Sequence, residues 1–381
     1  MTKVIVAGAG VGGLTAAIAL RRAGLEVELY EQAGVLRPIG AGLHIWTNAV
    51  KVLQGLGVAD KLAEHSSEMQ RAEFRTAGGG LLASWPIAET SRELGAPTLQ
   101  VSREELSNVL SGFVDEGTIH LGMKVTGFAE SDEGVEVRFE DGTSAQADVL
   151  VGADGLRSAV RAQILGDEPP REAGYTVWRG VFTGAGRMVE PGTFNSLFGR
   201  GERFVFYDLG FDVLYWMSVA GNEGAVETRG EALKEILRER HKGWMAPIPD
   251  MVAATDPADI HRTVIYDRPP DERWSSQRAT LLGDAAHPMT FNVGQGACQA
   301  MEDAVVLARE LSSGADVPAA LKAYEAARIP RTAKFQNLAT RLGNMGQWSN
   351  PAQVLMRNTT MRVIYRTVAL KEHKKDMAFT P

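Results

Sequence analysis

Cysteine is nearly absent from this sequence: its 381 residues include one, Cys298. A single thiol cannot form a disulfide within the chain, which is typical of proteins in a reducing compartment. The sequence also lacks a long run of lysine and arginine, and its formal net charge is −7. Because binding of nucleic-acid phosphates requires a basic face, nucleic acid is excluded as an expected partner.

Long apolar runs are absent too. No stretch reaches the roughly 18 apolar residues that a membrane-spanning helix needs. The chain opens with the strand-like segment "KVIVAG" rather than with a charged region and an apolar signal stretch. We therefore expect a soluble, cytoplasmic protein. Its 44% hydrophobic and 23% charged residues are ordinary globular composition, and its length predicts two or three lobes.

The first 31 residues carry a dinucleotide-binding pattern. An apolar strand ends at Gly8, a helical segment follows Gly10 and Gly13, and a second strand ends at Glu31. Gly8 allows the tight turn, Gly10 lets the backbone approach a pyrophosphate, and Gly13 lets helix and strand pack closely. Glu31 can accept a ribose hydroxyl but disfavours a 2′-phosphate. This pattern predicts NAD or the adenosine end of FAD, and not NADP, at this site.

Two later segments distinguish these dinucleotides. "ADVLVGADGLRSAVR" contains Asp154, and "RATLLGDAAHPMTFNVGQGACQAMEDAVVLA" contains Asp284 followed by a Gly-Gln-Gly turn. A simple NAD dehydrogenase needs neither segment. Asp284 can accept hydrogen bonds from the ribityl hydroxyls of FAD, and small residues at a helix start can direct backbone N–H groups at an anionic flavin ring. The residues expected there are Gly294, Gln295, Gly296 and Ala297.

These motifs together resemble the single-component FAD-dependent aromatic hydroxylases of the para-hydroxybenzoate hydroxylase fold. The similarity extends over nearly the whole chain, and 6-hydroxynicotinate 3-monooxygenase and FAD-dependent urate hydroxylase are members of this group. Arg103, in "VSREELSNVL", matches the flavin-contacting arginine of the family. The tail "GQWSNPAQVLMRN" is similar to the carboxy-terminal helical region of such proteins.

The resemblance implies an α/β fold with a Rossmann-like FAD-binding domain, an inserted and mainly antiparallel substrate sheet, and a C-terminal helical region. We expect the FAD-binding domain at residues 1–70, 98–174 and 270–317, the substrate domain at 71–97 and 175–269, and the helical region at 318–381. A monomer or a homodimer would fit.

The implied reaction is insertion of one oxygen atom from O2 into a phenol-like aromatic or heteroaromatic ring. NADH or NADPH reduces the FAD during a transient visit, and a C4a-hydroperoxyflavin carries the oxygen. Two alternatives stay open. The same chemistry can act on an alicyclic, polyketide or antibiotic substrate by hydroxylation or epoxidation, and a remote alternative is a flavin-binding redox sensor without catalysis.

The resemblance also suggests site residues. Within "RPIGAGLHIWTNAV", Arg37, Ala41 and Gly42 match flavin-contacting positions, while His44 and Trp46 face the pocket. His44 matches a histidine that helps to deprotonate a phenol in 6-hydroxynicotinate 3-monooxygenase-like members. A neutral imidazole with a pKa near the working pH can do so. The alternative is a structural histidine beside the flavin.

Further candidates lie on the expected sheet. Tyr215 can bond a ring hydroxyl, and Arg179 and Arg203 can attract a carboxylate or polarise an intermediate. Tyr207 and Phe291, together with Trp178 and Trp216, can form aromatic walls or belong to the core. For the arginines the alternative is a solvated strand face.

One departure from the family concerns the loop before Gly294. Phe291 stands where the family usually has proline, which leaves FAD binding intact but changes the expected pocket shape. His287 has no neighbouring ligands at metal-binding spacing, so no metal site is expected. Met301 to Asp303 fall inside a predicted helix and are expected to be structural.

Overall fold

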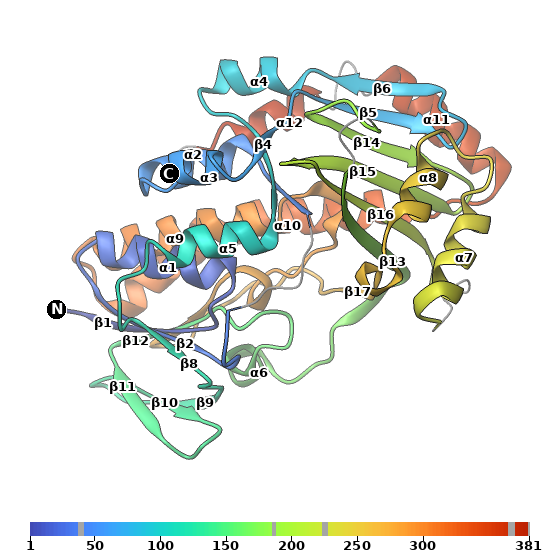
Figure 1. Ribbon diagram of the computed structural model, residues 1–381. Helices are drawn as coiled ribbons and strands as arrows, with labels where there is room; N and C mark the ends of the chain where they lie inside the picture. Colours follow the sequence, from blue (N-terminus) through green and yellow to red (C-terminus); the bar gives the residue numbers. More distant parts are fainter. Residues whose placement is uncertain (37–41, 185–187, 223–227, 365–369, 380–381) are drawn as a thin grey trace.

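The computed structural model describes residues 1–36, 42–184, 188–222, 228–364 and 370–379. The fold is α/β, with a parallel sheet in one part of the molecule and a large, mainly antiparallel sheet in the other (Figure 1). Helices from the C-terminal part of the chain extend along both parts.

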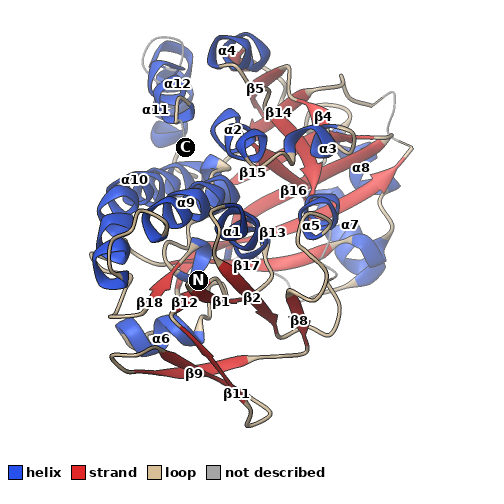
Figure 2. Ribbon diagram, turned by 90° about the vertical axis from the view of Figure 1, so that its left-hand side faces the viewer, coloured by secondary structure: helices blue, strands red, loops and turns tan. Residues whose placement is uncertain are grey.

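A five-stranded parallel sheet forms the first part, in the order β18-β12-β1-β2-β8. Its central strands β1 and β12 are short and mostly apolar, as expected for strands covered on both faces. The helices α1 and α9 pack against one another beside it, and α6 lies near the small sheet β11-β10-β9 on the other side (Figure 2). The bounds are β1 Lys3–Ala7, β2 Glu26–Glu31, β8 Ile119–Leu121, β9 Val125–Glu130, β10 Val135–Phe139, β11 Ser144–Ala147, β12 Val149–Gly152, β18 Ala279–Leu281, α1 Val11–Arg22, α5 Arg103–Ser111, α6 Ala159–Leu165 and α9 Gly296–Leu311.

A seven-stranded sheet forms the second part, in the order β17-β13-β16-β15-β14-β5-β6. Its neighbouring strands are antiparallel except for β14 and β5, which are parallel. The hairpin of β5 and β6 therefore belongs to the same sheet as strands that lie more than 100 residues later in the sequence. The bounds are β5 Arg71–Thr76, β6 Leu81–Trp85, β13 Arg171–Thr183, β14 Thr193–Phe198, β15 Glu202–Gly210, β16 Val213–Gly221, β17 His261–Asp267, α7 Gly230–Arg240, α8 Ile248–Ala254 and the 3-10 helix η2 Pro257–Asp259.

The two faces of this sheet have different neighbours, because side chains alternate along each strand. Trp178 and Trp216 lie on the outer face, in a buried cluster with residues of α7 and α8. Of the two roles considered for these tryptophans, the structure therefore supports the core. Tyr207 and Tyr215 belong to a separate buried cluster with Val205 on the inner face.

A second three-stranded sheet, in the order β3-β7-β4, connects the two parts, and its strand β3 pairs with β7. The bounds are β3 Gly42–Ile45, β4 Ser67–Glu68, β7 Leu99–Ser102, α2 Thr47–Gly55, α3 Ala59–Ala63 and α4 Ile87–Leu94. Because β3 pairs with β7, Gly42 and His44 are held in register with residues just before Arg103.

The C-terminal part is helical, as expected. A long helix, α10, spans Val317–Gly346, and it is followed by α11 at Pro351–Ile364 and α12 at Leu370–Met377. Two 3-10 helices precede α9, η3 at Gly283–Ala285 and η4 at Phe291–Val293. Among the helices in the described part of the chain, none is long and apolar enough to cross a membrane.

Candidate active site

The three glycines of the first motif have different physical roles. Gly8 has a φ of +100°, and an added Cβ would lie 2.5 Å from the Ala153 carbonyl oxygen. At Gly13 an added Cβ would lie 1.8 Å from the Gly8 carbonyl oxygen, so only glycine lets the helix pack there. At Gly10 an added Cβ would meet nothing within 4 Å. Gly10 thus leaves open space where a pyrophosphate can approach.

The N-terminus of α1 is suited to an anion. Gly10 is its N-cap and has no side chain to accept the first amides, so those N–H groups remain available together with the positive end of the helix dipole. Glu31 fixes the turn, because its Oε2 accepts the Ala9 amide at 2.8 Å and its Oε1 accepts the Ala33 amide at 2.8 Å. Each carboxylate oxygen keeps a second lone pair for a ribose hydroxyl.

Asp154 has a partly structural role. Its Oδ2 accepts the amides of Ala159 and Val160 at 2.8 and 3.3 Å and so caps α6. Its Oδ1 is buried and has no partner in the described part of the protein. Burial raises the pKa of this carboxyl. The orphaned oxygen is an acceptor that a hydroxyl of a bound cofactor would satisfy.

A second aspartate, Asp284, lies shortly after the end of a strand of the parallel sheet, β18. Asp284 follows this strand and is exposed. An added Cβ on Gly296 would lie 4.0 Å from its Oδ1, so Asp284 borders the start of α9. Gly294 has a φ of +64°, and the N-cap residue Gln295 makes no side-chain cap. The first amides of α9, including that of Ala297, are therefore free to face an anionic ring.

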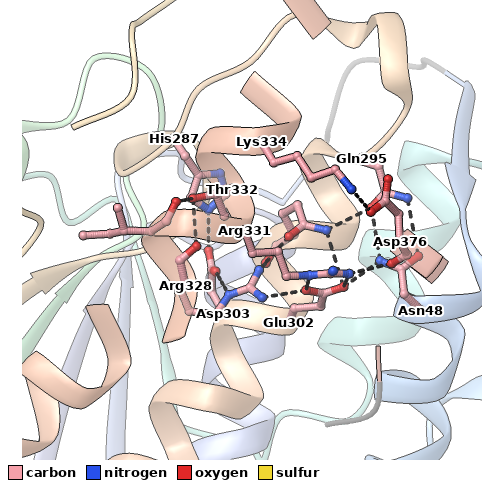
Figure 3. A network of polar contacts seen from close by, with 12 residues as sticks. Asn48, His287, Gln295, Glu302, Asp303, Arg328, Arg331, Thr332, Lys334 and Asp376 are labelled. Atoms are coloured by element: carbon pink, nitrogen blue, oxygen red, sulfur yellow. Dashed lines mark hydrogen bonds and ion pairs between the residues drawn. The ribbon is translucent and has the colours of Figure 1, made fainter. Parts of the chain in front are cut away.

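Gln295 has a side chain that turns away from this role and into a buried polar network (Figure 3). Its Oε1 accepts Nδ2 of Asn48 at 3.1 Å and Nε2 of Gln299 at 3.0 Å. Asn48 also donates to Glu302 at 2.7 Å. The network thus connects the start of α9 to the interior of the same helix and to α2.

Arg328 is the centre of the network. Its Nη1 lies 2.6 Å from Glu302 and its Nε lies 2.6 Å from Asp303. Asp303 lies 2.5 Å from His287 Nε2 and also accepts the Gly283 amide at 3.1 Å. These carboxylates are completely buried, so the segment from Met301 to Asp303 is structural, as predicted. The network thus holds the loop after β18, at Gly283 and His287, and the start of α9, at Gln295.

Two of the predicted cofactor contacts, Arg37 and Ala41, lie outside the described residues. Gly42 lies inside them, and an added Cβ there would be 2.5 Å from the hydroxyl oxygen of Tyr207. The substrate sheet therefore approaches the backbone of β3 closely. Arg103 is exposed at the first position of α5, next to Ser102, which pairs with Gly42. Its contact with flavin remains a prediction.

His44 lies between the substrate sheet and the loop before α9. Its ring centroid is 4.3 Å from that of Tyr207, 5.0 Å from that of Phe194 and 6.1 Å from that of Trp46. An added Cβ on Gly294 would lie 3.0 Å from Trp46 Nε1 and 3.7 Å from His44 Nδ1. The structure thus brings His44 and Trp46 together with the Gly-Gln-Gly turn.

The pKa expected for His44 does not hold in this environment. Burial lowers its pKa to about 3, and no nearby charge opposes the effect. Its Nε2 is buried and has no partner among the described residues. A neutral imidazole with so low a pKa forms hydrogen bonds but is a weak proton acceptor. The correction concerns the pKa argument; contact of His44 with substrate remains a prediction.

Tyr207 and Tyr215 face each other across β15 and β16, with ring centroids 5.2 Å apart. Both are 2% exposed. Burial raises the pKa of each phenol, while the positive charge of Arg179 acts in the opposite direction. Arg179 itself donates to Thr263 at 2.8 Å. Two neutral phenols and a guanidinium are therefore grouped on the inner face of the sheet.

Arg203 is the most deeply buried cation on this face, at 7% exposure. Its Nη2 donates to Asn292 Oδ1 at 2.6 Å, and its guanidinium lies 5.2 Å from the centroid of Phe291. Phe291 also contacts Tyr175 at a centroid distance of 6.1 Å. The phenylalanine that replaces the usual proline therefore packs against this guanidinium.

Several residues of the site were not identified from the sequence. Asn292 donates to Tyr175 at 2.7 Å and holds Arg203 in place. Gln100 pairs with His44 across β7 and β3, and both polar atoms of its amide are buried without a partner in the described chain. Its position three residues before Arg103 is the signal that the sequence offers for it. Arg357, on α11, lies near Arg203 and had no local signal.

A cleft of about 220 Å³ adjoins the Asp154 segment, and both acidic side chains (Asp167, Glu168) and arginines line it. Its lining includes Arg157, Arg161 and Arg268. Arg161 is held by Asp271 at 2.5 Å and by the carbonyl oxygens of Ala285 and Ala286. Through Arg161, the cleft borders both the segment after Asp154 and the segment after Asp284.

Comparison with known proteins gives a consistent result. Residues 1–196 and 213–339 match the family described as FAD binding domain. The chain is 42% identical over 379 residues to aurachin C monooxygenase/isomerase of Stigmatella aurantiaca, covering 99% of this chain and 98% of that protein. It is 35% identical to FAD-dependent urate hydroxylase of Klebsiella pneumoniae, covering 86% of each. The solved structure of Klebsiella pneumoniae HpxO with FAD and uric acid superposes with a TM-score of 0.91 at 30% identity, covering 100% of this chain and 96% of that chain.

Proposed function

Since the chain belongs to the FAD binding domain family and is an FAD-dependent monooxygenase of aromatic or heteroaromatic rings, we propose that its substrate is a hydroxylated heteroaromatic ring bound as an oxyanion. The observation that carries this proposal is the inner face of the substrate sheet. It presents Tyr207, Tyr215, Arg179 and Arg203, and neither arginine has a carboxylate partner in the described part of the chain.

The residues described above fit FAD in their chemistry. We propose that α1 and Glu31 hold the pyrophosphate and adenosine, that Asp284 and Asp154 accept hydroxyls, and that the first amides of α9 face the flavin ring. Bound FAD supplies the reduction and activation of O2. The surrounding chain keeps this reaction away from water with the aromatic side chains around His44 and Trp46.

The protein's own residues then orient the substrate. Arg203 attracts the ring oxyanion, Tyr215 donates a hydrogen bond from its neutral phenol, and His44 provides a neutral hydrogen-bonding group. Electron density on an ionised ring favours attack on an electrophilic oxygen, so stabilising the anion at a defined position also selects the carbon that reacts. A substrate that arrives already ionised requires no strong base from the protein.

NADH or NADPH is the proposed electron donor, in a transient visit together with O2. We further propose a cytoplasmic location, which the single, buried and unpaired cysteine supports.

A second candidate reaction follows from the relative that matches over the full length. The chain aligns with aurachin C monooxygenase/isomerase over 99% of its residues, including the C-terminal helices. We therefore propose aurachin C as a candidate substrate, with epoxidation or hydroxylation followed by rearrangement as the alternative outcome.

The substrate proposal is tested with FAD-loaded protein and a defined panel. Uric acid, 3-amino-4-hydroxybenzoate and aurachin C are each supplied with NADH or NADPH, and products are examined for a mass gain of one oxygen atom. We expect at least one hydroxylated heteroaromatic compound to accelerate oxidation of the donor and to gain oxygen. Absence of oxygen gain for both heteroaromatic compounds, uric acid and aurachin C, contradicts the proposal.

His44→Gln is expected to preserve the shape of the pH profile of kcat/KM. Because burial keeps the pKa of His44 near 3, its imidazole stays neutral at all higher pH values and contributes no titration between roughly pH 5 and 9. We expect kcat/KM to fall about tenfold through loss of one hydrogen bond. Steady-state rates across this pH range check the prediction. An inflection that is present in the wild type and absent from the variant would show that His44 does act as a base.

A further inference from the structure

Among the residues that the structure describes, two buried arginines have no counter-charge. Arg203, on β15, is 7% exposed, and Arg357, on α11, is 1% exposed. No described carboxylate lies within ion-pair distance of either. The Nε of Arg203 and the Nη1 of Arg357 are buried and lack a hydrogen-bond partner among the described residues.

The two guanidinium groups lie against the same aromatic ring. The Cζ of Arg357 is 5.0 Å from the ring centroid of Phe198, and the Cζ of Arg203 is 5.9 Å from it. Arg357 also donates to the Gly199 carbonyl at 2.9 Å. The pair is thus located where the turn between β14 and β15 meets α11, a helix that packs against β6 (Figure 1).

Another buried arginine, Arg328, does have carboxylate partners. Arg328 is also 1% exposed, but Glu302 and Asp303 each lie 2.6 Å from it. Although burial would lower its pKa, these carboxylates raise it. Burial lowers the pKa of Arg357 to about 10, and the pKa of Arg203 to about 10 with a further contribution from the charge of Arg357. Carboxylates thus offset the cost of burying charge at Arg328, whereas at the other two arginines the described residues supply neutral acceptors and an aromatic ring but no carboxylate.

An arginine with a purely structural role is expected to have its charge compensated within the chain, as Arg328 has. We propose that Arg203 and Arg357 form an anion subsite of the substrate pocket, which binds a carboxylate or ring oxyanion of the substrate. The proposal rests on the proposed function for the location of the substrate. It adds Arg357 as a specificity-determining residue, supplied by a helix beyond residue 339, where the match to the shared FAD binding domain ends.

A matched pair of ligands tests this subsite. Oxidised, FAD-loaded protein is titrated with 3-amino-4-hydroxybenzoate and with 3-amino-4-hydroxybenzamide, which differ in a single negative charge, and binding is followed by the change in flavin absorbance. We expect the wild type to prefer the anion by at least about tenfold, in line with a charge-assisted hydrogen bond. Arg357→Gln should reduce this preference about fivefold or more, and Arg357→Lys should retain part of it.

Arg362→Gln is the control, because Arg362 is an exposed cation on the same helix, and it should leave the preference unchanged. Arg357→Gln should also retain FAD and a thermal midpoint close to that of the wild type, since the substitution leaves no described carboxylate unpaired. A wild type without preference for the anion, or the same preference in Arg357→Gln, overturns the proposal. Since no electron donor is present, this result is independent of oxygen transfer.

Discussion

Replacing Arg328 by methionine is expected to lower the free energy of unfolding by about 3–5 kcal/mol, which is the usual cost of breaking a buried ion pair on one side. Glu302 and Asp303 are completely buried, and the guanidinium lies 2.6 Å from each. Methionine fills much of the same volume, so the loss reports two buried carboxylates that each keep one partner, Arg331 or His287, but have lost the guanidinium, rather than a cavity. Chemical denaturation followed by circular dichroism measures it.

Two controls separate charge from packing. Arg309→Met removes an exposed cation of α9 that pairs with Glu310, and it should leave stability nearly unchanged. Adding Glu302→Gln and Asp303→Asn to Arg328→Met should recover part of the loss, because neutral amides are cheaper to bury than carboxylates. If the triple variant is no more stable than Arg328→Met alone, the charges are not what stabilises this network.

Acid should weaken the same network. Burial alone would raise the pKa of Asp303, but the charges of His287 and Arg328 outweigh it and lower the pKa to about 2. A carboxyl with a depressed pKa in the folded state contributes stability that is fully present above its unfolded pKa of about 3.9. That contribution should be lost as the pH falls from about 4 to 2.

The network also reaches the C-terminus. Arg331 lies 2.6 Å from Glu302 and donates to the backbone carbonyl of Asp376 at 2.7 Å, while Lys334 pairs with the Asp376 side chain (Figure 3). The helix α12 is therefore connected through α10 to the start of α9. Loss of Arg328 should consequently loosen the contacts of Gln295 as well as lower overall stability.

Features that depend on residues close together in the sequence could be predicted, whereas features that depend on contacts between distant residues could not. The turn at Gly8, Gly10 and Gly13 is a local property of strand, helix and spacing, and the structure places all three as the pattern requires. Alternation along β13 and β16 likewise predicts two faces. This alternation does not show which face is turned toward the first part of the molecule, so the role of Trp178 and Trp216 cannot be predicted from it. In the structure, α7 and α8 cover both tryptophans.

The missed features all depend on distant packing. Arg357, which lies against the ring of Phe198, is more than 150 residues away from it in the sequence, and no motif marks this arginine. The pKa of His44 near 3 results from burial by Tyr207, Phe194 and their neighbours, which a residue type alone cannot supply. Residue spacing thus predicts the local turn that a cofactor would need, while the inner face of the seven-stranded sheet requires the arrangement of sheet, loop and C-terminal helices.

Gly10→Ala and Gly13→Ala are expected to fail in different ways. At Gly13 the new Cβ would lie 1.8 Å from the Gly8 carbonyl oxygen, and rigid backbone cannot yield at low cost. We expect Gly13→Ala to lose at least about 1–3 kcal/mol of stability through overpacking, and to be isolated without FAD. Gly10 has a φ of −71° and open space around its Cβ, so alanine is accommodated in the free protein.

Gly10→Ala should therefore fold with nearly wild-type stability, yet bind FAD at least about tenfold more weakly, because the methyl group occupies the path of the pyrophosphate. Circular dichroism with thermal unfolding of the FAD-free proteins measures stability, and titration with FAD followed by flavin fluorescence measures affinity. Wild-type affinity in Gly10→Ala would mean that the pyrophosphate does not approach this residue. An unstable Gly10→Ala would instead mean that the glycine is needed by the turn itself. Only the combination of an intact fold with weakened binding assigns the open space at Gly10 to the cofactor.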